Sequence, residues 1–181
     1  MAPVWLARGV QLKARGLAIA TGALVIIPAA LAMAGLRERS PALLLALLAM
    51  VWTADSAADF AGRRFGRRKL APAISPGKTW EGVAGGLAAS LAYAIILAHA
   101  EPRGLPVPEG WTAWTAYTLF AVLLCALSVV GDLFESAAKR QAGVKDSGAL
   151  LPGHGGVLDR IDSATSTLPV AALMFFLLSR W

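Results

Sequence analysis

The stretch LAIATGALVIIPAALAMAGL, residues 17–36, contains no charged side chain. A helix that crosses the hydrocarbon core of a bilayer needs about 20 mostly apolar residues. This stretch therefore predicts a transmembrane helix. It is too long for the apolar core of a signal peptide and lacks a convincing cleavage site, so we expect a retained anchor.

Four more apolar segments follow the first. The last is the weakest, because only its middle part is densely apolar. The five expected transmembrane helices cover residues 17–36, 41–61, 83–100, 111–131 and 164–181. The sequence thus predicts an all-α, polytopic membrane bundle that forms a single domain over residues 1–181.

The composition supports a membrane protein. Of the 181 residues, 57% are apolar and 15% are charged, against roughly 45–50% and about 25% in soluble domains. The mean hydropathy is +0.62. These values exclude a disordered chain, a coiled coil and a nucleic-acid-binding domain. The single cysteine, Cys125, excludes an internal disulfide framework and a cysteine-based zinc site.

Basic residues gather in three of the polar pieces. If the N-terminus lies in the cytoplasm, five helices place the N-terminal arm and the connections 62–82 and 132–163 on that side. These pieces hold 13 of the 17 Lys and Arg residues, and the other four are Arg37, Arg39, Arg103 and Arg180. Cytoplasmic loops carry an excess of Lys and Arg. We therefore expect both long polar connections to face the cytoplasm.

Two carboxylates lie near the end of the second apolar segment. Asp55 and Asp59 are four residues apart, so they share one face of a helix. A carboxylate at the centre of a bilayer costs about 2.5–3.5 kcal/mol. Either both side chains emerge among the lipid headgroups, or they form an inward-facing polar site close to the headgroup plane.

The first polar connection contains Gly62-Arg-Arg-Phe-Gly-Arg-Arg-Lys69, followed by Ser75-Pro-Gly-Lys-Thr-Trp-Glu-Gly82. The sequence Gly-Lys-Thr resembles the end of a P-loop. However, Pro72 stands where that motif has its first glycine, and no buried strand precedes it, so we reject a P-loop. A loop with two glycines, a lysine and two hydroxyls can still bind phosphate. The alternative for the basic run is a solvated, positively charged loop.

The second polar connection is rich in both carboxylates and cations. If the preceding helix continues, Asp132, Glu135 and Lys139 share one face, and Asp159 and Asp162 form a second acidic pair at i, i+3 spacing. Carboxylates beside cations are what a site for Mg²⁺ and a polyphosphate requires. The alternative is a set of helix-end ion pairs and a glycine-rich turn.

The same connection resembles the hallmark of the phosphatidate cytidylyltransferases, also called CDP-diacylglycerol synthases. The matching pattern is Ser136-x-x-Lys139-Arg140-x4-Lys145-Asp146-x-Gly148-x3-Pro152-Gly153-His154-Gly155-Gly156-x-x-Asp159-Arg160-x-Asp162. Trp52-Thr-Ala-Asp55-Ser56 and Ser75–Gly82 match the same family in the same order, and the resemblance spans about residues 15–178. Family members are usually longer, with additional N-terminal helices, so we expect a short form. They usually have glycine at position 57 and an aromatic residue at position 59, where this chain has Ala57 and Asp59.

The resemblance implies transfer of the cytidylyl group of CTP to phosphatidate, giving CDP-diacylglycerol and pyrophosphate. It implies Mg²⁺, alone or with a second metal ion or K⁺. It also implies an integral protein of the bacterial inner membrane that contacts membrane lipid, binds no nucleic acid and forms a homodimer. We expect phosphatidate and CTP to meet in a cleft between the second, fourth and fifth helices that opens sideways to lipid.

Motif positions assign roles to individual residues. The expected metal ligands are Asp132 and Asp159, with Asp146 and Asp162 as further ligands. Binding of the triphosphate or of the lipid phosphate falls to Lys78, Lys139, Arg140, Lys145 and Arg160. Further substrate contacts fall to Asp55, Ser75, Thr79, Ser136 and His154. The residues expected to act in catalysis are Asp132, Asp159, Lys139, Arg140, Lys145 and Arg160.

Three other functions are weighed against this one. A CTP-dependent polyprenol or phytol kinase would transfer a phosphoryl group to an alcohol instead. A small transporter would carry charges near the midplane of several helices, whereas here the polar groups cluster on one side. An inactive paralogue that binds a partner would have lost motif residues, and these carboxylates and lysines are all present.

Overall fold

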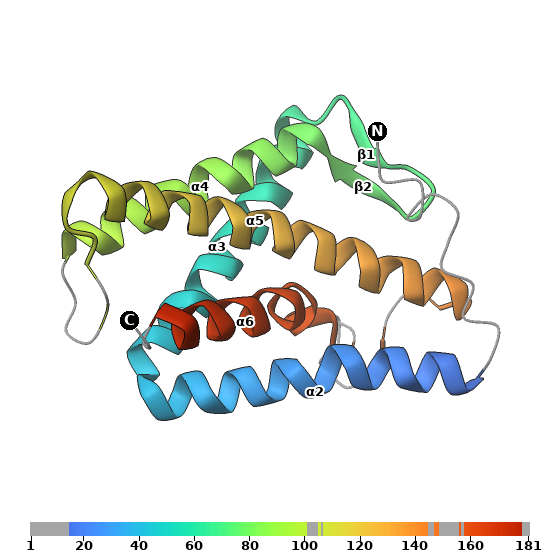
Figure 1. Ribbon diagram of the computed structural model, residues 1–181. Coiled ribbons are helices and arrows are strands. Elements are labelled where there is room, and N and C mark those ends of the chain that lie inside the picture. The colour runs from blue at the N-terminus through green and yellow to red at the C-terminus, as the bar shows by residue number, and fades with distance from the viewer. Residues whose placement is uncertain are drawn as a thin grey trace.

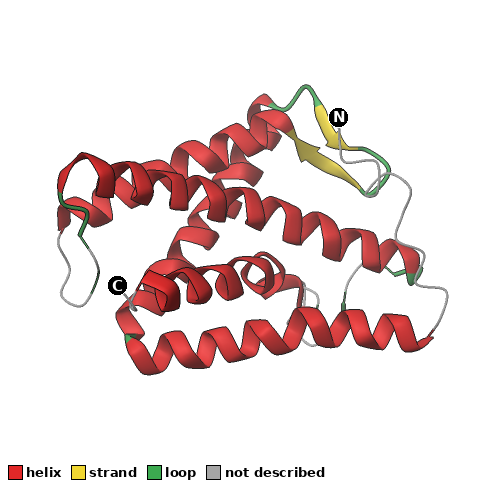
Figure 2. Ribbon diagram, viewed as in Figure 1, coloured by secondary structure: helices red, strands yellow, loops and turns green. Residues whose placement is uncertain are grey.

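The computed structural model describes residues 15–100, 105, 107–144, 147–148, 156 and 158–178. The described part contains five helices and one two-stranded sheet (Figures 1 and 2). The helices are α2 (Arg15–Arg39), α3 (Pro41–Phe65), α4 (Trp80–Ala100), α5 (Gly110–Gln141) and α6 (Leu158–Leu178), and the strands are β1 (Lys69–Ala71) and β2 (Ser75–Thr79). The all-α, polytopic prediction is confirmed.

Four of these helices contain stretches long and apolar enough to cross a membrane. The stretches are Ile19–Arg39, Pro41–Phe65, Trp80–Ala100 and Gly110–Gln141. The fifth predicted span, in α6, contains a shorter apolar run, Ile161–Leu177.

The helices extend into polar sequence beyond the predicted boundaries, three of them by four residues or more at one end. The second ends at Phe65 instead of 61, the fourth continues to Gln141 instead of 131, and the fifth begins at Leu158 instead of 164. A search for apolar residues finds only the part of a helix that suits hydrocarbon. The polar ends remain helical because their residues form the same i→i−4 hydrogen bonds.

A short β-hairpin, which the sequence did not predict, joins α3 to α4. Its antiparallel strands pair Lys69 with Thr79 and Ala71 with Ser75. Buried Ala71 and Ile74 pack against Leu133 of α5. The strands are very short, and β2 contains proline and glycine, which are depleted in strands. The local sequence therefore gives little strand signal, and packing on α5 stabilises the hairpin.

Figure 1 shows how the helices are arranged. Helix α3 packs along α4, while α6 packs against both α2 and α5. Glycines of α4 permit the first contact: a Cβ at Gly82 would lie 2.7 Å from the carbonyl oxygen of Ala58, and a Cβ at Gly86 would lie 3.0 Å from that of Ala54. Small residues allow membrane helices to approach this closely.

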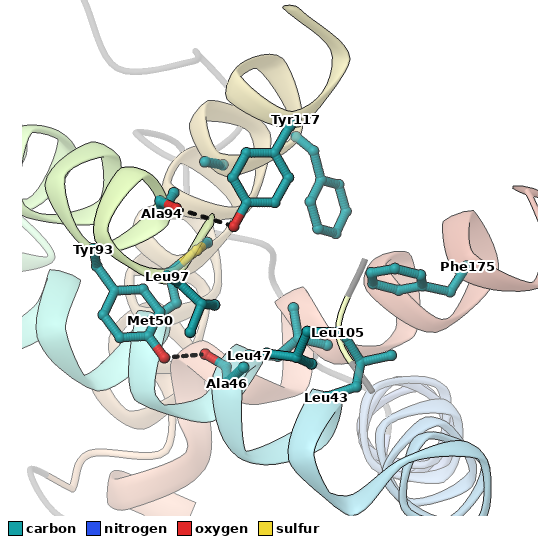
Figure 3. A pocket seen from close by; sticks show the side chains of 12 residues that line it. Leu43, Ala46, Leu47, Met50, Tyr93, Ala94, Leu97, Leu105, Tyr117 and Phe175 are labelled. Carbon is teal, nitrogen blue, oxygen red and sulfur yellow. Dashed lines mark hydrogen bonds between the residues drawn. The ribbon is translucent and has the colours of Figure 1, made fainter. Parts of the chain in front are cut away.

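The apolar core joins α3 to its neighbours on the side away from the hairpin. Leu43, Leu47 and Met50 of α3 belong to one buried cluster with Leu124 of α5 and Leu168 of α6. Figure 3 shows a small apolar cavity of about 40 Å³ in this region. In its wall the Tyr93 hydroxyl donates a hydrogen bond to the Ala46 carbonyl oxygen, and the Tyr117 hydroxyl donates one to that of Ala94 (3.2 and 3.1 Å). No charged side chain lines this cavity, so we interpret it as part of the core.

Candidate active site

A polar cleft of about 690 Å³ lies where the end of α3, the hairpin, the start of α4 and the middle of α5 meet. In a chain with few charges, this cleft brings six charged residues together. The charged lining residues are Asp55, Asp59, Arg63, Lys69, Lys78 and Asp132. The cleft is the candidate active site.

Asp55 is fixed in the cleft by a helix that faces it. The Ser128 hydroxyl of α5 donates a hydrogen bond of 2.8 Å to Asp55 Oδ1. The buried hydroxyl of Ser163 in α6 lies close to the same carboxylate. Of the two arrangements considered for Asp55, the structure has the inward-facing one. Ser128 lies inside an apolar segment, so its polarity was the only signal that could have identified it.

An ion pair between Lys78 and Asp132 connects two walls of the cleft. Lys78 lies on β2 and Asp132 on α5, 54 residues later, and the ammonium group donates a hydrogen bond to the carboxylate. The Ser136 hydroxyl, one helical turn after Asp132, also donates to it (3.4 Å). Ser75 lines the same cleft. A cation and a carboxylate that sequence analysis assigned to phosphate and to metal are thus in direct contact.

The hairpin is held in place by the first turn of α4. The Glu81 carboxylate accepts hydrogen bonds from the backbone N–H groups of Arg67 and Arg68 (3.0 and 3.1 Å). The Thr79 hydroxyl oxygen accepts one from the Gly82 N–H at 3.1 Å and is buried, as in a helix N-cap. The structure gives Thr79 this local role at the cleft wall. Sequence analysis assigned no role to Glu81.

Replacing Glu81 with Ala is expected to loosen the hairpin, because two backbone amides lose a charged acceptor. Hydrogen exchange measured by mass spectrometry should then be severalfold faster at the amides of Arg67 and Arg68. Glu81→Gln, which keeps an acceptor oxygen, should give a smaller increase. Glu109→Ala, at an exposed acid that makes no capping bond on α5, should leave these amides unchanged. Equal exchange in Glu81→Ala and the unmodified chain would contradict this role.

A second set of charged residues lies outside the cleft lining. Lys139 pairs with Glu135 on α5 (Nζ–Oε1 3.4 Å), and Glu135 and Asp162 line a largely apolar cavity of about 780 Å³ between α2, α5 and α6. Asp162 still lies within electrostatic range of Asp132 and Lys78. The Arg140 guanidinium donates a long hydrogen bond of 3.5 Å to the Ile74 carbonyl oxygen.

The walls of the cleft differ from the expected ones. Sequence analysis expected the second, fourth and fifth helices, which are α3, α5 and α6. Among the described residues, the lining comes from α3, the hairpin, α4 and α5. The contribution of α4 consists of Gly82, Val83 and Gly86. Gly82 ends the motif Ser75–Gly82, but Val83 and Gly86 carry no reactive group and lie outside the motifs, so motif analysis could not place them in the wall.

Several expected site residues cannot be placed. Lys145, Asp146 and His154 lie outside the described residues. Asp159 and Arg160 belong to the first turn of α6, where only the backbone is described. Among the described residues, no three His, Cys, Asp or Glu side chains are close enough to hold a metal ion together.

Comparison with known proteins gives a consistent match. A family model described as the cytidylyltransferase family matches residues 3–178. The chain is 52% identical over 134 residues to the phosphatidate cytidylyltransferase of Haemophilus influenzae, 47% over 157 residues to that of Pseudomonas aeruginosa and 44% over 130 residues to that of Bacillus subtilis. These matches cover 74%, 86% and 72% of this chain, and 46%, 56% and 45% of the relatives. The chain therefore spans about half the length of the curated relatives it matches.

Proposed function

The chain belongs to the cytidylyltransferase family, and from this premise we propose that it transfers the cytidylyl group of CTP to phosphatidate. The products are CDP-diacylglycerol and pyrophosphate. The observation that carries the proposal is the polar cleft, in which Lys78 and Asp132 meet between apolar helices. A cleft of this kind suits one substrate from the aqueous phase and one from the membrane.

The reaction needs positioning and charge neutralisation more than covalent catalysis. A phosphate oxygen of phosphatidate attacks the α-phosphorus of CTP and forms a new P–O bond. The bond from that phosphorus to the oxygen that links it to the β-phosphorus breaks, and pyrophosphate leaves. Both substrates and the departing pyrophosphate are anions. Arg63, Lys69 and Lys78 line the cleft and would reduce the repulsion between them, while fixed geometry lowers the entropic barrier.

The cleft also fits a magnesium ion. Mg²⁺ in phosphate sites is bound through one or two protein carboxylates, with the remaining ligands supplied by substrate phosphates and water. Asp132 lies in the cleft, and Asp55 lies within electrostatic range of it, which meets this requirement without a cluster of three acids. When bound, Mg²⁺ would neutralise charge on the phosphates of CTP. Asp132 would hold it, with Asp159, Asp162 and Asp146 as further proposed ligands.

We place the cleft on the cytoplasmic side of a bacterial inner membrane. CTP is a cytoplasmic metabolite, and most of the Lys and Arg residues lie in the arm and connections at that end of the helices.

The test uses the purified chain in detergent–lipid micelles with Mg²⁺, phosphatidate and CTP labelled in the cytosine. We expect the label to enter the lipid phase as CDP-diacylglycerol, with Asp132→Asn as the blank. A folded sample that leaves the cytosine label in water, but transfers γ-phosphate from CTP to a polyprenol or phytol acceptor, would overturn the proposal in favour of a kinase.

A further inference from the structure

The last turn of α3 and the short segment that joins it to β1 carry three arginines that do not line the cleft. Every residue from Arg63 to Lys69 is exposed. Arg63 pairs with Asp59 one turn earlier, and both Arg63 and Lys69 line the cleft. Arg64, Arg67 and Arg68 do not line it, and within the described residues no ion pair joins them to an acid.

The surrounding sequence offers few acids to neutralise these charges. Glu81 is the only acid between positions 60 and 100. Its carboxylate binds the backbone amides of Arg67 and Arg68, which fixes the main chain of this segment against α4. The main chain that carries Arg67 and Arg68 is thereby fixed within four residues of Arg64, at the end of α3.

Exposed aromatic side chains accompany the arginines. Phe65, the last residue of α3, is 60% exposed, and Trp80, the first residue of α4, is 48% exposed. The Arg64 guanidinium lies over the Phe65 ring, 5.8 Å from its centre. Aromatic residues are enriched at the level of the lipid headgroups, and this favours the same level for the neighbouring arginines.

We propose that Arg64, Arg67 and Arg68, together with Phe65 and Trp80, form a surface that binds the headgroups of anionic phospholipids. Clusters of basic residues at the end of a transmembrane helix attract such lipids, by about 1 kcal/mol for each cation. We call these five residues the basic-aromatic surface. It adjoins the cleft, because Arg63, Gly66 and Lys69 of the same segment line the cleft wall. Given the proposed function, the surface also concentrates phosphatidate, itself an anionic lipid, at the mouth of the cleft.

The first test measures lipid preference without substrate. The chain is reconstituted in phosphatidylcholine vesicles that contain spin-labelled phosphatidylglycerol or spin-labelled phosphatidylcholine, and the protein-bound fraction of each is determined by electron paramagnetic resonance. The variant Arg64→Gln/Arg67→Gln/Arg68→Gln should lower the relative affinity for phosphatidylglycerol by about five-fold or more. This is the change expected when the attraction of at least one arginine to anionic lipid is lost. High salt should have the same effect on the unmodified chain.

A matched control removes two arginines from another helix end. Arg37 and Arg39 lie in the last turn of α2 and are exposed, but no aromatic residue lies within that turn. Arg37→Gln/Arg39→Gln should keep the preference for phosphatidylglycerol. The proposal would be overturned if the triple variant kept its preference for phosphatidylglycerol, or if the control lost it equally. It would also be overturned if inorganic phosphate abolished the preference as effectively as excess anionic lipid.

The second test concerns the link to the cleft. With phosphatidate diluted in neutral detergent, the triple variant should have a raised KM for phosphatidate and an unchanged kcat, while the KM for CTP stays constant. An unchanged KM for phosphatidate would overturn the concentrating role. The lipid-preference measurement involves no turnover, so a failure of the proposed reaction would leave its result intact.

Discussion

Replacing Asp132 with Asn should lower the formation of CDP-diacylglycerol by about 100-fold or more, the effect typical of losing one preorganised charged group in an active site. The Asp132 carboxylate of α5 forms an ion pair with Lys78 of β2 and so links these two elements. Asn has nearly the same shape and can still accept the hydrogen bond that Ser136 donates, so the chain should remain folded. Initial rates and thermal unfolding of the same sample in micelles would be measured together.

Two comparisons show whether Asp132 acts on the substrates or only holds Lys78. If Asp132 serves only to orient Lys78, then Asp132→Asn/Lys78→Gln should be no slower than Lys78→Gln alone. We expect the double variant to be slower than either single variant. Glu38→Gln, the same change at an exposed acid near the end of α2, should keep the unmodified rate. More than half of the normal activity in Asp132→Asn would remove this residue from the proposed machinery.

The sequence predicts the chemistry of the site better than its shape. Asp55, Lys78 and Asp132 stand out because a charged residue in an apolar chain needs a reason, and the structure gathers all three in one cleft. The supporting residues give much weaker signals. Ser128 is a single hydroxyl in an apolar helix, and Glu81 acts on backbone amides that any sequence has.

Residue spacing did not show that acids of α5 and α6 line two different cavities. Asp132 was predicted as a principal metal ligand and Asp162 as a further one. Asp132 lines the cleft, whereas Asp162 lines the cavity shared with α2, next to Glu135 and within electrostatic range of Asp132. Which side of α5 a residue of α6 faces depends on how closely the two helices approach. That approach is controlled by residues without functional groups, above all Gly131, which directly precedes Asp132.

Replacing Gly131 with Ala should destabilise the chain by about 1–3 kcal/mol, the usual cost of an extra group in a packed interface. A Cβ at this position would overlap the Ser166 hydroxyl of α6, and would lie 2.8 Å from Ser166 Cβ and 3.2 Å from the Asp162 carbonyl oxygen. The Ser166 hydroxyl cannot move without losing the hydrogen bond of 2.8 Å that it donates to the Leu127 carbonyl oxygen. Thermal unfolding in micelles would measure the loss.

Two further variants separate helix contact from the general effect of glycine. Gly35 of α2 has open space around it, so Gly35→Ala should stabilise the chain slightly, through the better helix propensity of alanine. In Gly131→Ala/Ser166→Gly the added methyl group occupies the volume of the removed side chain, and the double variant should recover most of the stability that Gly131→Ala loses. Because α6 begins with the acidic pair Asp159 and Asp162, a displaced α6 should also lower activity, and the double variant should restore it. A stable Gly131→Ala chain, or a double variant less stable than the single one, would show that this contact does not determine how α6 packs on α5.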